Sequence, residues 1–177
     1  MPTEQLMFRR ATESDIPAWV ALVNAAYRGE GSYVGWTTEA HLLDGTRIDT
    51  DLAKKLLTDE SSRVFLGWLP EHSQPVASLY LRPEPLDLYL GMITVSPTLQ
   101  NKGLGKQILQ FAEREAQQQG FHSLRITVIS LRSELLEWYL RHGYIDTGIE
   151  EPFCTDHPAY GVPRSYFKMK VLRKSLR

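Results

Sequence analysis

Apolar and polar side chains alternate along the chain with two different periods, and these periods predict helices and strands. Residues 15–27 and 103–119 carry apolar side chains at three- and four-residue spacing, which is typical of a helix with one buried side. Near the C-terminus the period changes to two. There Phe167, Met169 and Val171 are expected to face inward while the residues between them face outward, as in a half-buried strand.

Applied to the whole chain, the same criteria predict helices and strands in alternation. Helices are expected over residues 15–27, 39–43, 51–58, 103–119 and 133–142. Strands are expected over residues 6–11, 63–69, 76–82, 86–95, 124–129 and 144–149, followed by the closing strand around residues 166–171. The strand–helix–strand unit over residues 88–129 should be a right-handed parallel crossover. The prediction is an α/β fold: a mixed, mostly antiparallel central sheet with a parallel strand–helix–strand core.

Length and composition narrow the class of protein. A chain of 177 residues without an internal linker fits a single domain over residues 1–177. Its 20 basic and 21 acidic side chains give a net charge of −1, which argues against a nucleic-acid binder that depends on bulk positive charge. The polar N-terminus lacks the apolar stretch of a secretory signal, no apolar run is long enough to span a bilayer, and Cys154 is the only cysteine. We therefore expect a cytoplasmic protein that contacts neither nucleic acid nor membrane.

The most informative segment joins a predicted strand to the long helix that follows it. The first turn of a helix has backbone N–H groups without partners and a partial positive charge, so it attracts phosphate. Gly103 and Gly105 lack the Cβ atoms that would keep a phosphate away from those donors. Lys102 and Lys106 add positive charge, and the Gln100 amide can donate a hydrogen bond. This loop is therefore predicted to bind a diphosphate.

Two common nucleotide-binding motifs do not fit this loop. A dinucleotide fingerprint needs a third glycine three positions after the second, where this chain has Ile108. A Walker loop needs glycine at position 100 and Ser or Thr after Lys106, where this chain has Gln100 and Gln107. The loop also follows several predicted strands, whereas a dinucleotide cradle is expected on the first strand–helix turn.

A different phosphate-binding family does fit. Gln100-x-x-Gly103-x-Gly105 matches the acyl-CoA pyrophosphate motif, Q/R-x-x-G-x-G/A, of the GNAT N-acetyltransferase superfamily. Residues 139–144, YLRHGY, resemble the family's Y-x-x-x-G-F/Y signature, and the order of elements is similar over nearly the whole chain. The resemblance implies the GNAT-like acyl-CoA N-acyltransferase fold. It also implies direct transfer of an acetyl group from acetyl-CoA to an amine of a small molecule, peptide or protein.

The resemblance further implies that the two central parallel strands separate and admit the pantetheine arm of the coenzyme. Gly91 is the expected site of the bulge that starts this separation. Backbone groups around Val95 would pair with pantetheine amides, and a backbone N–H near residues 92–94 would polarise the thioester carbonyl. The predicted coenzyme-binding residues are Met92, Ile93, Thr94, Val95, Gln100, Asn101, Lys102, Gly103, Leu104, Gly105, Lys106 and Arg132.

Arg132 marks a departure from the family pattern. It stands seven residues before Tyr139, where family members often have an asparagine that binds pantetheine. The sequence leaves three roles open for this arginine: contact with a CoA phosphate, capping of the following helix, or an exposed surface position.

Tyr139 stands at the position of the family's general acid, and a phenol is protonated at neutral pH. Many members place a glutamate as general base on the strand before the cradle, where this chain has Tyr89. Two other carboxylates are the candidate bases. Asp87 lies two residues earlier on the same strand face and can act through a water, and Glu150 lies at the mouth of the closing strands.

The segment after the first predicted helix is expected to select the substrate. Residues 28–51 hold five acids and two arginines, a local net charge of −3, which favours a cationic amine. The acids are Glu30, Glu39, Asp44, Asp49 and Asp51. Tyr33, Trp36 and Tyr89 are the candidate substrate-binding residues. The alternative is a solvated acidic surface with Trp36 in the core.

The remaining motifs do not point to other chemistry. The five histidines and Cys154 show no spacing typical of a metal site, so no metal is expected. Residues 164–177 hold six basic side chains and no acid, and they are expected to form an exposed sheet edge. Two other functions stay open: a non-catalytic acyl-CoA-binding regulatory domain, because the strand glutamate is missing, and an RNA- or ribosome-associated module that uses the basic tail. A homodimer is compatible with the sequence.

Overall fold

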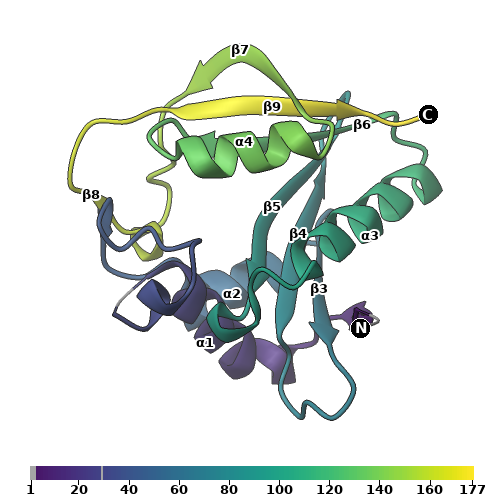
Figure 1. Ribbon diagram of the computed structural model, residues 1–177, viewed down its shortest axis with the longest axis vertical. Helices are drawn as coiled ribbons and strands as arrows, with labels where there is room; N and C mark the ends of the chain where they lie inside the picture. The colour runs from purple at the N-terminus through teal and green to yellow at the C-terminus, as the bar shows by residue number, and fades with distance from the viewer. Residues whose placement is uncertain (1–2, 29) are drawn as a thin grey trace.

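A seven-stranded sheet forms the centre of the protein, with helices on both of its faces (Figure 1). The structure is a computed structural model and describes residues 3–28 and 30–177. The strands follow one another across the sheet in the order β1-β3-β4-β5-β6-β9-β7, and β2 and β8 form a separate two-stranded sheet. None of the described helices is both long and apolar enough to cross a membrane.

The helices and strands have the following bounds. The helices are α1 (Ile16–Tyr27), α2 (Thr50–Thr58), α3 (Leu104–Gln118) and α4 (Ser133–Arg141). The strands of the main sheet are β1 (Met7–Arg10), β3 (Arg63–Trp68), β4 (Ala77–Pro83), β5 (Leu88–Val95), β6 (Ser123–Ile129), β7 (Ile145–Glu151) and β9 (Met169–Ser175). The small sheet pairs β2 (Leu43–Asp44) with β8 (Val162–Pro163).

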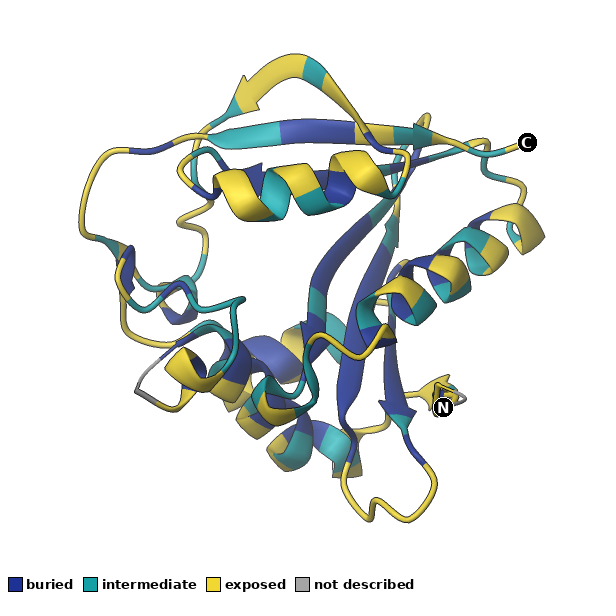
Figure 2. Cartoon of the chain, in the orientation of Figure 1, coloured by how far each residue is buried: buried dark blue, intermediate teal, exposed yellow. Residues whose placement is uncertain are grey.

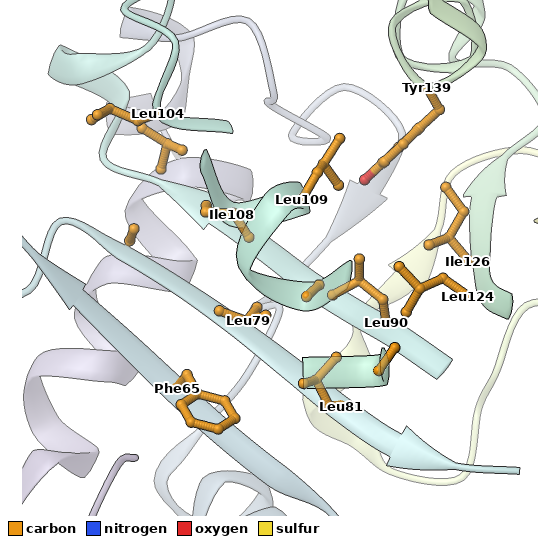
Figure 3. Packing of buried hydrophobic residues seen from close by; sticks show 14 of the residues in the cluster. Phe65, Leu79, Leu81, Leu90, Leu104, Ile108, Leu109, Leu124, Ile126 and Tyr139 are labelled. Atoms are coloured by element: carbon orange, nitrogen blue, oxygen red, sulfur yellow. The ribbon is translucent and has the colours of Figure 1, made fainter. Parts of the chain in front are cut away.

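Side chains alternate between the two faces of the central strands, and each face has its own core. On one face Leu79 and Leu90 pack with Ile108 of α3 (Figure 3). On the other face Tyr80 and Met92 pack with residues of α1 and α2. Figure 2 shows the resulting pattern, in which β4 and β5 are largely buried while the outer sides of α3 and α4 are exposed. Because both faces are covered, these strands bury nearly every side chain.

The predicted elements agree with the structure except for the expected short helix at residues 39–43, which is wrong. There the carbonyl of Glu39 accepts hydrogen bonds from the N–H groups of Leu42 and Leu43, and the chain then enters β2. A single turn forms because β2 pairs with β8, more than a hundred residues away in sequence. The parallel pairing of β5 with β6 is confirmed, and the other strand pairs of the main sheet are antiparallel.

The expectation of an exposed sheet edge in the basic tail is also wrong. β9 pairs with β6 on one side and β7 on the other, so it lies inside the sheet and β7 forms the edge. Basic side chains of β9 pair with acids of neighbouring elements: Lys170 with Asp146, at 3.3 Å, and Lys174 with Glu113. The tail is therefore a structural strand, and much of its charge is matched.

Candidate active site

The two central parallel strands separate soon after they meet. β5 and β6 pair only at Leu88 with Leu124 and at Tyr89 with Arg125, although both strands continue (Figure 1). From Leu90 onward the edge of β5 that faces β6 makes no ladder pair with it. The separation that the sequence predicted is thus present. It leaves backbone groups of β5 facing an opening instead of a neighbouring strand.

A bulge accompanies the separation, one residue later than the sequence predicted. Gly91 pairs regularly with Tyr80, and the register slips after it. Met92 takes the left-handed backbone conformation, with φ +49°, and its carbonyl accepts a hydrogen bond of 3.0 Å from the Thr94 hydroxyl. Gly91 is needed for another reason: a Cβ there would lie 2.8 Å from the ring of Tyr89. The expected bulge at Gly91 is therefore corrected to Met92 and Ile93.

The phosphate-binding loop has the geometry of an anion site. Asn101 and Gly103 both have positive φ, +64° and +80°, and α3 begins directly afterwards at Leu104. This turn points successive backbone N–H groups toward one side, next to the positive end of the helix. Lys102 and Lys106 are exposed, and neither forms an ion pair with any residue that the structure describes. Their charge is therefore available to an anion.

Trp138 of α4 forms the opposite wall of this loop. A Cβ at Gly105 would lie 2.9 Å from the Trp138 ring, so glycine is required for α3 and α4 to come this close. The ring also lies 6.1 Å from that of Trp36 and 4.4 Å from that of His142. The sequence did not single out Trp138, because its role depends on the contact between two helices.

A cavity of about 410 Å³ runs between the start of α3 and α4. It brings together many of the predicted coenzyme-binding residues with Tyr139. Those that line it are Ile93, Val95, Gln100, Asn101, Gly103, Leu104, Gly105 and Lys106. Met92 instead faces the opposite side of the sheet, and Thr94 is buried. The residues of the groove are compatible with a long anionic coenzyme whose phosphates lie at α3 and whose reactive end lies at Tyr139.

Gln100 lines this groove, but its amide is already engaged. The amide oxygen accepts a hydrogen bond of 2.8 Å from the Trp36 N–H, and the amide nitrogen donates to the Thr37 hydroxyl and the Val95 carbonyl. A Cβ on Gly35 would lie 2.3 Å from the Gln100 amide, so the approach is close. The amide therefore joins the loop at residues 35–37 to the end of β5. The expected role as a free donor to phosphate is not what the contacts show.

Arg132 is buried, which excludes the exposed surface position. Its guanidinium donates to the backbone carbonyls of Thr37 and Trp36, at 3.0 and 3.2 Å, and its side chain does not cap α4. It also lies 3.8 Å from the carboxylate of Glu39, which accepts two hydrogen bonds from Arg28. Desolvation lowers the pKa of Arg28, and the neighbouring Glu39 carboxylate opposes that effect. The sequence did not predict this buried network, because Arg132 is far in sequence from Arg28 and Glu39.

Tyr139 lies where the separated strands meet the groove. It is 7% exposed, and its hydroxyl points toward the sheet (Figure 3). The hydroxyl has no hydrogen-bond partner among the described residues. Burial raises the pKa of Tyr139 well above its usual range, and the nearby Tyr27 adds to this effect. The phenol is therefore protonated across the physiological pH range and can donate a hydrogen bond.

Tyr27 is a second buried tyrosine at the same place, and the sequence suggested only a packing role for it. Its hydroxyl donates a hydrogen bond to the Ile93 carbonyl, within the bulge of β5. Burial raises the pKa of Tyr27 to about 12, and the negative charge of Glu39 contributes. Tyr27 thus fixes the direction of one bulged peptide group beside Tyr139.

The structure does not bring either candidate base to Tyr139. Asp87 is buried at the opposite end of β5, before the strands separate, and it accepts hydrogen bonds from Arg173, at 2.6 Å, and from Ser123. Glu150 is exposed in β7 and lies 3.8 Å from Lys168. Both carboxylates have cationic partners, so their positions are explained by ion pairing within the sheet.

The three candidate substrate-binding residues lie in three different parts of the structure. Tyr33 is 58% exposed, and Trp36 lines the coenzyme groove. Tyr89 lies on the other side of the sheet, where the guanidinium carbons of Arg82 and Arg125 lie 4.7 and 5.4 Å from the centre of its ring. Of the three, only Tyr89 faces a cavity away from the coenzyme groove.

Two further cavities continue the groove through the sheet. A small one of about 90 Å³ lies at the separation of β5 and β6 and shares Tyr139, Tyr27 and Ile93 with the groove. A third, of about 330 Å³, lies beyond the sheet and shares Tyr89 and Arg47 with the small one. The groove and this far cavity therefore approach the same point from opposite faces.

The acids of residues 28–51 do not form a negative wall. Asp44 pairs with Arg164 at 2.7 Å, Asp51 with His157 at 2.9 Å, and Asp49 caps α2. Glu39 is held by the two buried arginines described above, and the Glu30 side chain lies outside the described residues. Of the described acids in this segment, Glu39, Asp44 and Asp51 thus have basic partners, and Asp49 serves as a helix cap.

One group of possible metal ligands does occur among the described residues. Oxygen and nitrogen atoms of Asp49, Asp51 and His157 lie within 4.8 Å of one another. Local contacts account for all three: Asp49 accepts the Leu52 N–H, and His157 accepts the Ala159 N–H while donating to Asp51. The sequence did not suggest this group, because the histidine follows the acids by more than a hundred residues.

Comparison with known proteins identifies the family. The chain matches the family model described as "Acetyltransferase (GNAT) family" over residues 19–144, more than half of its length. The protein therefore belongs to the GNAT acetyltransferase family, as the sequence motifs predicted. A sequence search of curated proteins finds no match.

Solved structures agree with the family assignment at the level of the fold. A GNAT-family protein from Desulfovibrio desulfuricans superposes with a TM-score of 0.71 at 16% identity, covering 98% of this chain and 100% of that one. A GNAT acetyltransferase from Elizabethkingia anophelis with acetyl-CoA bound gives 0.63 at 18% identity, covering 97% and 98%. The ribosomal-protein-S18-alanine N-acetyltransferase from Escherichia coli gives 0.67 at 14% identity, covering 97% and 94%.

Proposed function

We propose that this protein transfers the acetyl group of acetyl-CoA directly to a primary amine of a small molecule or peptide. The observation that carries the proposal is the continuity of one groove, which begins at the left-handed turn of Gly103 and ends at Tyr139. The free charges of Lys102 and Lys106 support binding of a diphosphate at the first end. The acetyl-CoA bound to the related structure from Elizabethkingia anophelis is consistent with this assignment.

Bound acetyl-CoA would supply an acetyl thioester, whose C–S bond breaks as a C–N bond to a neutral amine forms. The nitrogen then loses one proton and the sulfur takes one up, so the products are an amide and a thiol. Tyr139 is suited to hold the proton that the departing sulfur takes up. Because its pKa is raised well above that of a thiol of roughly 8.5, full transfer is uphill, so Tyr139 acts mainly through a hydrogen bond to the sulfur. The bulge at Met92 and Ile93 turns backbone groups toward the opening, where an N–H can polarise the carbonyl.

The amine must also lose a proton, and among the described residues no unpaired carboxylate lines the small cavity beside Tyr139. Glu39 faces the small cavity, but Arg28 and Arg132 hold it, which makes it a poor base. We therefore infer that the amine enters in its neutral form or loses its proton to water. This feature also favours the second candidate function, a non-catalytic acyl-CoA-binding regulatory domain.

Thiol release across a panel of amines, together with direct titration of CoA, separates the two functions. An acetyltransferase releases CoA in an amine-dependent manner, and Tyr139→Phe lowers turnover by about 10²-fold or more while CoA affinity is unchanged. If CoA binds and no amine raises thiol release above background, the binding-only function is correct. Loss of CoA affinity in Tyr139→Phe would contradict the catalytic role.

The phosphate-binding loop is tested with two glycines of nearly equal backbone geometry. Gly103 has φ +80° and Gly148, in the exposed edge strand β7, has φ +78°. A valine at either position must adopt the left-handed region, at a cost of about 1–2 kcal/mol. Gly103→Val should weaken CoA binding, whereas Gly148→Val should lose similar stability and bind CoA normally. Equal CoA affinity in both variants would remove the loop from the coenzyme site.

A further inference from the structure

The cavity on the far side of the sheet from the coenzyme groove holds an arginine without a partner. Arg47 lines both this cavity and the small one at the strand separation. Its Nη1 atom is buried and makes no hydrogen bond, and its side chain forms no ion pair with any described residue. Its guanidinium carbon lies 5.5 Å from the centre of the Tyr160 ring.

The position of Arg47 is fixed by its backbone. Asn24 of α1 accepts hydrogen bonds from the N–H groups of Arg47, at 2.9 Å, and Ile48, at 3.1 Å, and it donates to the Ile48 carbonyl at 2.8 Å. Ile48 is fully buried. Three hydrogen bonds with one side chain thus hold this segment against α1, so the Arg47 side chain that lines the cavity starts from a fixed backbone.

The other basic side chains that line this cavity have carboxylate partners. Arg82 and Arg125 both pair with Glu84, at 3.2 and 2.8 Å, and Arg125 also lies 3.4 Å from Glu151. Asp156 lines the same cavity but is exposed, and it forms no ion pair with a described residue. Among the described residues that line this cavity, Arg47 is therefore the basic side chain that forms no ion pair with a carboxylate.

An arginine cannot lose its proton in a protein, so a partly buried guanidinium without a partner carries an uncompensated desolvation cost. A carboxylate is the group that its planar donors match best, because two parallel N–H groups can bind both oxygens. Tyr80, Phe153 and Met169 also line the cavity and offer apolar surface to the rest of a ligand.

We propose that Arg47 binds a carboxylate of the acceptor, so that the acceptor is an amino acid or a similar amine that carries a carboxylate and an apolar side chain. This inference rests on the proposed acetyltransferase function. It replaces the cationic amine that the acidic residues 28–51 suggested, since those acids have other partners.

Matched pairs of amines test the proposal in the wild-type protein. Phenylalanine and phenethylamine, leucine and isopentylamine, and methionine and 3-(methylthio)propylamine differ within each pair only in the carboxylate. With acetyl-CoA present, kcat/KM should be at least about 10-fold higher for a carboxylate member, as expected for a hydrogen-bonded charged group. Equal or faster reaction of the decarboxylated members overturns the proposal and leaves the acetyltransferase function intact.

A variant locates the effect. Arg47→Met keeps an unbranched stem and removes the guanidinium group with its charge, so it should raise KM for the carboxylate members about 10- to 100-fold. It should leave the decarboxylated members and CoA affinity within about 2-fold of wild type. Arg10→Met, which removes an exposed arginine in β1, is the control and should change neither. If Arg47→Met does not fold, Arg47→Lys keeps the charge and loses the paired donors, and it should show an intermediate loss.

A binding measurement separates failure of this proposal from failure of the proposed function. Without acetyl-CoA, the carboxylate member of a reactive or binding pair should raise the melting temperature of the wild-type protein and not that of Arg47→Met. If no amine is acetylated but this shift is present, the acetyltransferase function fails and the carboxylate site stands. If no carboxylate member raises the melting temperature and none is acetylated in preference to its partner, the carboxylate site is refuted.

Discussion

The buried network around Glu39 gives the sharpest prediction about stability. Its carboxylate accepts hydrogen bonds of 3.2 and 3.1 Å from Arg28 and lies 3.8 Å from Arg132, and all three side chains are at most 12% exposed. Glu39→Ala leaves two buried guanidinium groups without their counter-charge, which should cost about 3–5 kcal/mol. A domain of this size loses about 2–4 °C per kcal/mol, so the melting temperature should fall by about 6–20 °C.

A matched control lies a few residues away. Asp44 also pairs with an arginine, Arg164, at 2.7 Å, but both side chains are more than half exposed. Asp44→Ala should therefore cost at most about 1 kcal/mol. Urea unfolding of both variants and of the wild type, followed by circular dichroism, gives the free energies. If Glu39→Ala unfolds within about 1 kcal/mol of Asp44→Ala, the buried network contributes no more than a surface pair, and the reasoning is refuted.

Two further predictions concern the loop next to β5 and the start of α1. Gln100→Ala removes three hydrogen bonds, to Trp36, Thr37 and Val95. It should therefore lower the free energy of unfolding by about 2–3 kcal/mol and also weaken CoA binding. An unchanged melting temperature would contradict the role of Gln100 in joining residues 35–37 to β5. The Arg9 guanidinium lowers the pKa of Asp15 to about 2, so the carboxylate stabilises the fold above its usual pKa and this stabilisation disappears as the pH falls toward 2. Urea unfolding of the wild type and of Asp15→Asn from pH 6 to 2 measures this effect, and the difference in their free energies of unfolding should shrink as the pH falls. A difference that grows on acidification would show that the folded state does not lower the pKa of Asp15.

Local patterns were sufficient to predict most of the fold. The helix α3 is readable because its apolar residues repeat along one side, and the phosphate-binding loop is readable because Gly103 and Gly105 act through the backbone of the same segment. The order of elements then placed β5 beside β6. Each of these inferences uses residues that are close in sequence, where spacing determines which groups can meet.

Roles that depend on distant contacts could not be predicted in the same way. Arg132 finds its backbone partners 95 and 96 residues away, and Gln100 bonds to residues 63 and 64 positions earlier. Similarly, the net charge of residues 28–51 is a property of a segment of sequence. The charge that a ligand meets depends instead on which side chains line the cavity, and these come from several segments. Asp44 and Asp51 belong to that segment and point to partners from the C-terminal part of the chain.

The bulge in β5 shows how packing decides between two neighbouring residues. Glycine is the usual choice for a left-handed backbone, and Gly91 was the natural candidate on that ground. The ring of Tyr89 lies over Gly91, however, so its lack of a Cβ already serves side-chain packing. The strain falls on Met92 and costs about 1–2 kcal/mol. Burial of the Met92 side chain and the Thr94 hydrogen bond to its carbonyl offset that cost, at the residue where β5 must turn away from β6.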